Sequence, residues 1–384
     1  GSGGNQYYHQ HEGLKDRLYL NDGQGNFTKS AKLPEFFNQT SCVKAADVDM
    51  DGDLDLFVGS RSIPVNYGVP ADSYLLLNDG SGTFELAEAD VIDLKRLGMV
   101  TDAGWTDIDQ DDDLDLVIVG EWMPITIFEN QGGTFQRIGL HSLRGSSGWW
   151  NSIEVADLDD DGDEDWVVGN FGQNAMLNPE PEEPVRLYVR DFDNNLSKDP
   201  ILTYFRQHKE YTVAGLDELS KQLVHLKRQF RTYSQFANSS LTDIFSSKEL
   251  AKAMKLEVQT FASVMVFNEG RGNFKLVELP PQAQWAPVFG TLADDIDGDG
   301  KTDLLLGGNF YEIQPSIGRM DANPGVFLQG QGNSDFRAIP NRETGLFIEG
   351  QVRDMQWFDW AGKRAVIIAR NDADLQLYLI SPSP

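Results

Sequence analysis

Aspartate residues recur at alternate positions of short loops in this chain of 384 residues, a spacing that suits metal coordination. The first loop reads Asp47-Val-Asp-Met-Asp-Gly-Asp-Leu-Asp55, with carboxylates at positions 1, 3, 5 and 9 and glycine at position 6. Alternate side chains of a tight loop can turn towards one centre, and glycine permits the positive φ angle that the bend needs. Roughly six to eight oxygen ligands suit Ca²⁺ better than Mg²⁺. The spacing therefore predicts a calcium-binding loop.

The same pattern of nine residues occurs four more times along the chain. Positions 1, 3, 5 and 9 are expected to supply side-chain oxygens, and position 7 its main-chain carbonyl. The candidate ligands are Asp47, Asp49, Asp51, Asp53 and Asp55; Asp107, Asp109, Asp111, Asp113 and Asp115; Asp157, Asp159, Asp161, Asp163 and Asp165; Asp191, Asp193, Asn195, Ser197 and Asp199; and Asp295, Asp297, Asp299, Lys301 and Asp303. We predict three to five structural Ca²⁺ ions, because two of the five loops depart from the pattern.

The departures lie at position 6, where Asp112 and Leu196 replace glycine in the second and fourth loops. The alternative interpretation of any single loop is an acidic turn exposed to solvent. Repetition in one register argues against it for the three loops that keep the glycine. The occupancy of the Asp107 and Asp191 loops is left open.

These loops also explain most of the net charge of −28, which arises from 60 acidic and 32 basic residues. The five loops hold 25 of the acidic residues and two basic ones, so they carry −23 and the remaining 339 residues carry −5. An acidic surface disfavours nucleic acid as a partner. No apolar run reaches the roughly 18 residues of a membrane span. One cysteine, Cys42, excludes an internal disulfide framework.

The loops are not EF-hands, because apolar β-strands follow them and no glutamate stands at position 12. A second motif lies between the loops: a short apolar strand, a glycine-rich turn and an aromatic residue. It is clearest in Leu75-Leu-Leu-Asn-Asp-Gly-Ser-Gly-Thr-Phe84 and is a hairpin signal. Strand, acidic loop, strand and hairpin make a blade of four strands. The sequence thus predicts an all-β fold, a β-propeller of six to seven blades within one domain, residues 1–384.

Two intervals between the loops are irregular. The short one, around residues 179–184, is expected to be a blade with trimmed connections. The long one contains residues 207–256, in which Leu216, Leu219 and Leu223 fall on one helical face and Ser246 with Glu249 forms a capping box. We expect a two-helix insertion on one face of the propeller, as a brace or as a docking platform. Residues 352–379 are expected to form a last blade without an acidic loop.

The loops and the Asn-Asp-Gly-x-Gly-x-Phe hairpins together resemble the FG-GAP/VCBS-repeat β-propellers, which include the propeller of integrin α subunits. The wording of the repeats is most similar to large bacterial VCBS-repeat proteins that are secreted or attached to the cell surface. The resemblance implies a calcium-stabilised propeller located outside the cytosol, periplasmic or associated with the outer membrane. It also implies a role in adhesion, recognition or assembly, with accessories of outer-membrane nutrient importers as one setting. The chain is a whole propeller or a piece of a longer one.

No catalytic motif accompanies the loops, so we expect a non-enzymatic module that binds a protein or a glycan. The alternatives are a propeller enzyme acting on polysaccharide, such as a lyase, and a lectin. A lyase needs a base and a charge-neutralising group beside an open groove, and a lectin would repeat one aromatic pocket in each blade. Trp149 and Trp150 are the candidate ligand-facing residues. They are adjacent in a strand, so at most one is expected to pack between blades.

Overall fold

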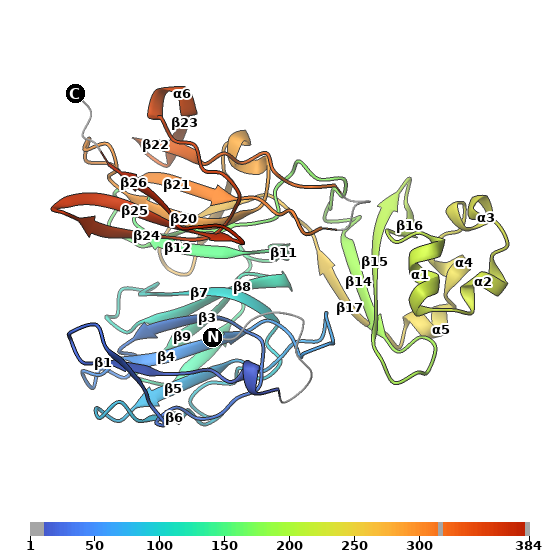
Figure 1. The fold of residues 1–384 in the computed structure, drawn as a ribbon, viewed down its shortest axis with the longest axis horizontal. Helices are drawn as coiled ribbons and strands as arrows, with labels where there is room; N and C mark the ends of the chain where they lie inside the picture. Colours follow the sequence, from blue (N-terminus) through green and yellow to red (C-terminus); the bar gives the residue numbers. More distant parts are fainter. Residues whose placement is uncertain (1–10, 314–317, 381–384) are drawn as a thin grey trace.

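The computed structural model describes residues 11–313 and 318–380, and its architecture is all-β (Figure 1). Antiparallel sheets of up to five strands follow one another along the chain, which confirms the predicted β-propeller class. Within the described ranges, no helix is long and apolar enough to cross a membrane.

Four sheets follow the predicted blade pattern. An inner strand enters an acidic loop, a buried second strand leaves it, and a glycine turn joins the third strand to the fourth. Their strands are β3 (Thr40–Ala46), β4 (Asp55–Ser60), β5 (Tyr74–Asn78) and β6 (Phe84–Leu86); β7 (Met99–Thr106), β8 (Asp115–Met123), β9 (Thr126–Asn130) and β10 (Phe135–Ile138), with β11 (Gly148–Trp149) added beside β8; β12 (Ser152–Ala156), β13 (Asp165–Gly169), β18 (Val264–Asn268) and β19 (Phe274–Glu278); and β20 (Val288–Asp294), β21 (Asp303–Gly308), β22 (Val326–Gly332) and β23 (Asp335–Ile339).

The two ends of the chain form smaller sheets. The predicted last blade is a sheet of three strands, β24 (Gln351–Trp360), β25 (Lys363–Asn371) and β26 (Gln376–Leu379). The N-terminal hairpin is a separate pair, β1 (Tyr19–Asn21) and β2 (Phe27–Lys29). Short helical turns connect elements at η1 (Glu12–Leu14), η2 (Pro281–Gln284) and α6 (Asn341–Thr344).

The core of the propeller lies between neighbouring sheets. The inner strands β3, β7, β12, β20 and β24 contact one another in this order. Apolar clusters fill the space between each pair of sheets, and they include the fully buried Phe57, Trp166 and Leu304. Strands buried on both faces explain the continuous apolar runs that follow each acidic loop.

One predicted blade is not part of the propeller. The sheet that carries the Asp191 loop consists of β14 (Val185–Arg190), β15 (Asp199–Arg206), β16 (Lys209–Thr212) and β17 (Met254–Val258). It is inserted between β13 and β18, which pair directly with each other through Val168 and Val264. Among the described residues, five sheets therefore form the propeller, in place of the expected six or seven. The short interval before Asp191 reflects this insertion and not a trimmed blade.

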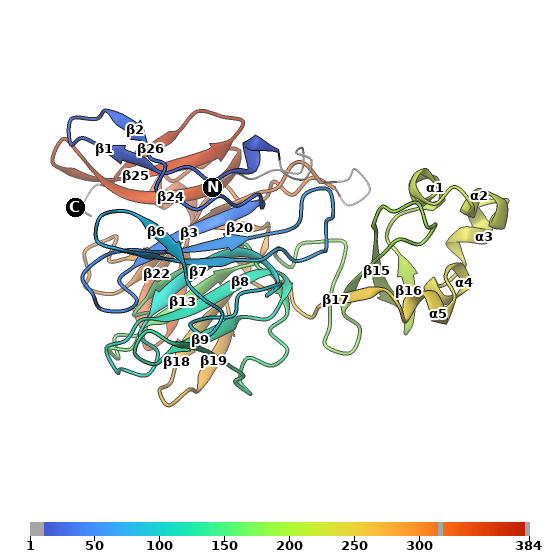
Figure 2. The same cartoon turned by 90° about the horizontal axis from the view of Figure 1, so that it is seen from below.

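The expected insertion of residues 207–256 is the outer part of this larger one. It contains five short helices instead of two: α1 (Leu216–Gln222), α2 (Leu226–Gln229), α3 (Tyr233–Ala237), α4 (Leu241–Ile244) and α5 (Ser247–Leu250). The predicted capping box of Ser246 and Glu249 starts α5. The helices pack on Tyr188 and Ile201 of the inserted sheet and do not lie on the propeller, from which they project (Figures 1 and 2).

The other face of the inserted sheet packs against one end of the propeller. Leu187 and Val189 of β14 approach the loop after β4 so closely that a Cβ added at Gly68 would lie within 2.8 Å of both side chains. The insertion leaves and returns at one point, because the side-chain amide of Asn170 donates to the carbonyl oxygens of Thr260 and Ala262. The inserted sheet and its helices, which we call the lobe, are thus joined to the propeller by two adjacent chain segments and an apolar contact.

Candidate metal centres

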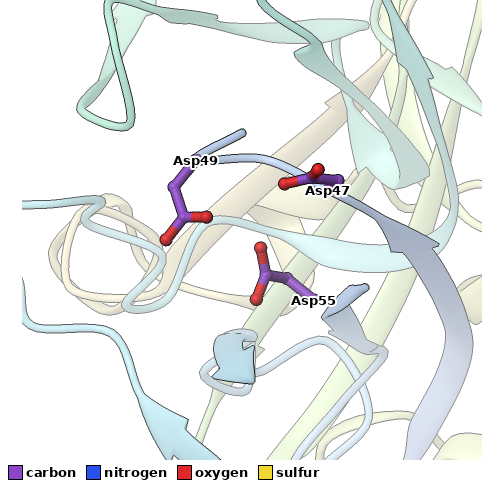
Figure 3. A group of neighbouring side chains, drawn as sticks. All are labelled: Asp47, Asp49 and Asp55. Atoms are coloured by element: carbon purple, nitrogen blue, oxygen red, sulfur yellow. The ribbon is translucent and has the colours of Figure 1, made fainter. Parts of the chain in front are cut away.

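Each of the five acidic loops gathers three carboxylate groups. In four loops these come from positions 1, 3 and 9, as for Asp47, Asp49 and Asp55, whose side chains point towards one another (Figure 3). In the fifth loop the gathered residues are Asp295, Asp297 and Asp299. Within each group, one oxygen of every residue lies within 4.8 Å of the others.

The backbone of each loop is held by its own first aspartate. Asp47 accepts the N–H groups of Asp51 and Gly52 at 3.1 and 3.0 Å, and the first residues of the other four loops also accept the N–H of position 6. Position 6 has the predicted positive φ angle in all five loops, including Asp112 at 70° and Leu196 at 73°. Position 4 is also left-handed, as in Met50, and sequence reasoning missed it.

The ninth residue closes each loop at the buried entrance of the second strand. Asp115 accepts the N–H of Ile108 at 2.9 Å and the N–H of Asn130 at 2.7 Å, and it is fully buried. Burial raises the pKa of Asp115 and of Asp165 to about 7, and that of Asp303 to about 6. A cation beside these oxygens would favour their charged form.

The side chains of positions 5 and 7 have other hydrogen-bond partners in most loops. Outside the fifth loop, the position 5 side chain is not part of the gathered group. Asp51 and its counterparts Asp111, Asp161 and Asn195 accept the N–H of position 7 instead. The side chains of position 7 also lie outside the groups: that of Asp113 accepts from Gly132, and that of Asp163 from Gln110.

The chemistry of the donors fits a hard cation. Every gathered ligand atom is a carboxylate oxygen, the ligand that Ca²⁺ and Mg²⁺ prefer. In the third loop, Oδ1 of Asp159 is buried and has no hydrogen-bond partner among the described residues. A buried carboxylate oxygen without a partner is costly, and a bound cation would remove that cost. The gathered groups can therefore hold metal ions.

Hydrogen bonds connect the loops of neighbouring propeller sheets. The side-chain amide of Asn130 donates to the carbonyl of Val48 in the preceding loop, and that of Asn268 donates to the carbonyl of Ile108. From the fourth sheet, Ser334 donates to Oδ2 of Asp159 at 2.9 Å and Thr302 to the carbonyl of Asp157. Sequence reasoning missed these residues. The asparagine that recurs before the hairpin turns at positions 78, 130 and 268 is the signal that could have indicated two of them.

The two candidate ligand-facing tryptophans are packed inside apolar clusters. Trp150 is fully buried between propeller sheets. Trp149 is half-buried and stacks on Phe171 at 4.8 Å between ring centroids. Only Trp150 packs between propeller sheets, whereas Trp149 packs between the propeller and the inserted sheet, which covers the side that would otherwise face solvent.

Comparisons with known proteins agree with the repeats. Residues 6–58 and 107–168 match the family model described as FG-GAP-like repeat, and these regions contain the first three acidic loops. These two regions are FG-GAP-like repeats, and they contribute strands to sheets of the β-propeller. The comparison of this chain with curated proteins finds no match.

Solved structures with similarity to this chain differ widely from it in sequence. Sqt1 of Saccharomyces cerevisiae has 10% identity and a TM-score of 0.42, and the match covers 96% of this chain and 79% of that one. The V. cholerae biofilm matrix protein Bap1 has 13% identity and a TM-score of 0.32, with 95% and 73% covered. BBS1N, solved in complex with ARL6DN, has 9% identity and a TM-score of 0.26, with 90% and 93% covered.

Proposed function

We propose that this FG-GAP-repeat propeller is a non-enzymatic binding or assembly module that is stabilised by calcium and works outside the cytosol. The observation that carries the proposal is the repeated loop. In the propeller sheets, each acidic loop gathers three carboxylates at the end of an inner strand and is also hydrogen-bonded to a neighbouring sheet. Such sites support a scaffold, because an ion in one loop would fix the position of the next sheet.

Calcium would be held by Asp47, Asp49 and Asp55, by the equivalent residues of the next three loops, and by Asp295, Asp297 and Asp299. It would neutralise carboxylates that otherwise repel one another at short distance. Free calcium is plentiful outside cells, and extracellular modules use sites of moderate affinity. This chemistry supports the extracellular setting. The resemblance of the repeats to bacterial surface proteins supports a more specific setting, as an accessory of an outer-membrane nutrient importer.

A polysaccharide lyase is the second candidate, because one groove combines an arginine with a tyrosine. The groove has a volume of about 550 Å³, lies between the last two propeller sheets and is lined by Arg337, Glu343 and Tyr378 among others. The hydroxyl of Tyr378 is already bonded to the carbonyl of Phe347 and to Gln376. A tyrosine held in this way is a poor proton acceptor, so the groove favours the binding module.

The test is chemical cross-linking of the protein to its native cell envelope in calcium and in chelator, followed by identification of the adducts. We expect one defined protein or glycan adduct that forms in calcium and is lost in chelator. Turnover of a polysaccharide, with no adduct in either condition, would contradict the proposal and favour the lyase.

A further inference from the structure

The helical part of the insertion differs in charge from the rest of the molecule. Residues 207–256 contain eight basic and five acidic residues, a net charge of +3. The rest of the chain contains 24 basic and 55 acidic residues, a net charge of −31. Between residues 219 and 242 there are four basic residues and no acidic one. A basic surface is therefore concentrated on an otherwise acidic protein.

The four basic side chains are exposed on α1, on α2 and between α2 and α3. Lys221, Lys227, Arg228 and Arg231 are all exposed, and none of them forms an ion pair with a described residue. The opposite side of the same helices is buried in an apolar cluster with the inserted sheet. Its residues include Leu219, Leu223, Leu226, Phe230 and Phe236. Folding of the lobe therefore does not require the four charges.

Two exposed apolar side chains belong to the same segment of the chain. Val224 and Tyr233 are each 66% exposed. The hydroxyl of Tyr233 donates to Asp217 on α1 at 2.8 Å, which fixes the ring in place while its faces stay in solvent. An exposed aromatic ring that is already ordered loses little entropy when a partner covers it. We call Lys221, Val224, Lys227, Arg228, Arg231 and Tyr233 the cap face.

The cap face lies far from the acidic loops of the propeller. Those loops follow the C-terminal ends of the inner strands. The insertion follows the C-terminal end of β13, which runs antiparallel to inner strand β12, so it leaves from the opposite end of the sheet. The helices then project beyond the propeller (Figures 1 and 2). A partner on the cap face would thus be separated from the most negative part of the molecule, and the opposite charges of the two ends would help to orient it.

We propose that the cap face is a docking surface for an acidic protein surface. The inference deepens the proposed binding function, on which it rests. Arginine and tyrosine are among the residues enriched at the energetic centres of protein interfaces. A membrane fits less well, because four cations contribute roughly 4 kcal/mol on an anionic bilayer and the two apolar side chains add little anchoring. Polysaccharide fits less well too, because ligands of that size usually occupy clefts, and the large groove lies between propeller sheets.

The test measures binding of a fluorescein-labelled peptide rich in glutamate, with tyrosine and leucine at intervals, by anisotropy in calcium. The cap variant carries Lys221→Glu, Lys227→Glu, Arg228→Glu and Arg231→Glu. The matched control carries Lys29→Glu, Lys95→Glu, Lys275→Glu and Lys363→Glu, four exposed residues outside the insertion. Both variants change the net charge equally, so only the location of the change differs.

We expect the cap variant to raise the Kd about tenfold or more and the control to raise it about twofold at most. Glutamine at the same four cap positions should raise the Kd less. This variant serves as the test if charge reversal disturbs the folding of α1 to α3. Tyr233→Ala should weaken binding several-fold without any change of charge.

Equal losses in the cap variant and the control would overturn the proposal, because net charge alone would then explain binding. The proposal would also be overturned if the peptide does not bind and another ligand binds through the cap face. The ligands to compare are vesicles of phosphatidylserine and phosphatidylcholine, and polygalacturonate. An envelope adduct formed equally by wild type and cap variant would overturn the cap face and leave the proposed function intact.

Discussion

The two carboxylate oxygens of Asp159 have different surroundings, and this difference makes the residue a sensitive position in the third loop. Oδ2 accepts from Ser334 of the neighbouring sheet at 2.9 Å. Oδ1 is buried and has no hydrogen-bond partner among the described residues. One oxygen thus serves the contact between sheets, and the other is free for a cation.

We expect Asp159→Asn to lower the free energy of unfolding in saturating calcium by about 2 to 3 kcal/mol, the stabilisation that a ligand gives at about 100 times its Kd. Differential scanning calorimetry in calcium and in chelator measures the effect. In chelator the free energy of unfolding should fall less, because asparagine also removes a charge that repels the other carboxylates of the loop.

Asp193→Asn is the matched control, since Asp193 holds the same loop position in the inserted sheet. In that loop, Leu196 replaces the glycine of position 6 and Asn195 replaces the aspartate of position 5. We expect a smaller calcium-dependent loss than for Asp159→Asn. A larger loss at Asp193 would mean that the fourth loop, and not the third, is the stronger site.

A second sensitive residue, Glu154, lies away from the metal loops on inner strand β12. Burial is the main cause that raises its pKa from 4.5 to about 7; Asp102 of β7 and Asp354 of β24 raise it further, and Lys44 of β3 lowers it. Lys44 itself pairs with Asp102 at 2.9 Å. Inner strands of three other propeller sheets therefore place charged groups near this carboxyl.

Glu154→Gln should remove part of the pH dependence of stability. Because the pKa is raised on folding, the folded protein holds a proton that the unfolded chain has released between pH 4.5 and about 7. Stability of the wild type therefore falls as the pH rises through this window. Relative to the variant, the fall should be about 1 to 3 kcal/mol. Chemical unfolding of both proteins at pH 5 and pH 8 in calcium measures it, and parallel curves would contradict the assignment.

At the scale of elements, the asparagines before the hairpin turns form two kinds of contact. Asn268 is buried, and its amide donates to the carbonyl of Ile108 at 3.1 Å. Asn78 occupies the same place in the first propeller sheet, but its amide reaches only Leu54 of its own sheet at 3.3 Å. The same residue type thus makes a contact between sheets in one case and within one sheet in the other.

Asn268→Ala should therefore cost about 1 to 3 kcal/mol, because it leaves a buried carbonyl without its donor. Asn78→Ala should cost clearly less, since its bond lies at the surface. Urea denaturation of both variants in calcium provides the comparison. If the two losses were equal, the bond to Ile108 would not contribute to the cohesion between sheets.

Strands and hairpins were the elements that the sequence predicted best. Their signals are local: alternate carboxylates, apolar runs and glycine turns act within roughly ten residues. The capping box of Ser246 and Glu249 was predictable for the same reason. The position of the inserted sheet was not, because it depends on the pairing of Val168 with Val264, which are far apart in the chain. Spacing alone cannot show that the strands between them belong elsewhere.

The candidate metal centres were predicted in part for a related reason. The register of Asp47, Asp49 and Asp55 is a property of nine consecutive residues, so the sequence contained it. The burial of Trp149 depends on a sheet formed by a distant segment, and no local pattern of residues indicates this cover. Residues whose role depends on contacts between sheets, such as Ser334, were missed on the same grounds.

For the whole molecule, we expect chelation to lower the melting temperature by many degrees. The gathered carboxylates then repel one another at the end of every propeller sheet except the last, and the loops are linked through hydrogen bonds between sheets. Calcium should restore the melting temperature better than magnesium, which demands a stricter geometry and gives up its water reluctantly. Thermal unfolding with each ion at equal ionic strength is the measurement. An unchanged melting temperature in excess chelator would contradict the assignment of the acidic loops as metal sites.

The position of the insertion also has a consequence for the order in which the chain folds. Strands β13 and β18 pair through Val168 and Val264, so the third propeller sheet requires closure of a long loop. The entropy that such closure costs rises with the length of flexible chain. If β14 to β17 and their helices form first, the two ends of the loop are brought together, because β14 pairs with β17 close to where the insertion leaves and returns. The lobe would then act as an early folding unit on which completion of the propeller depends.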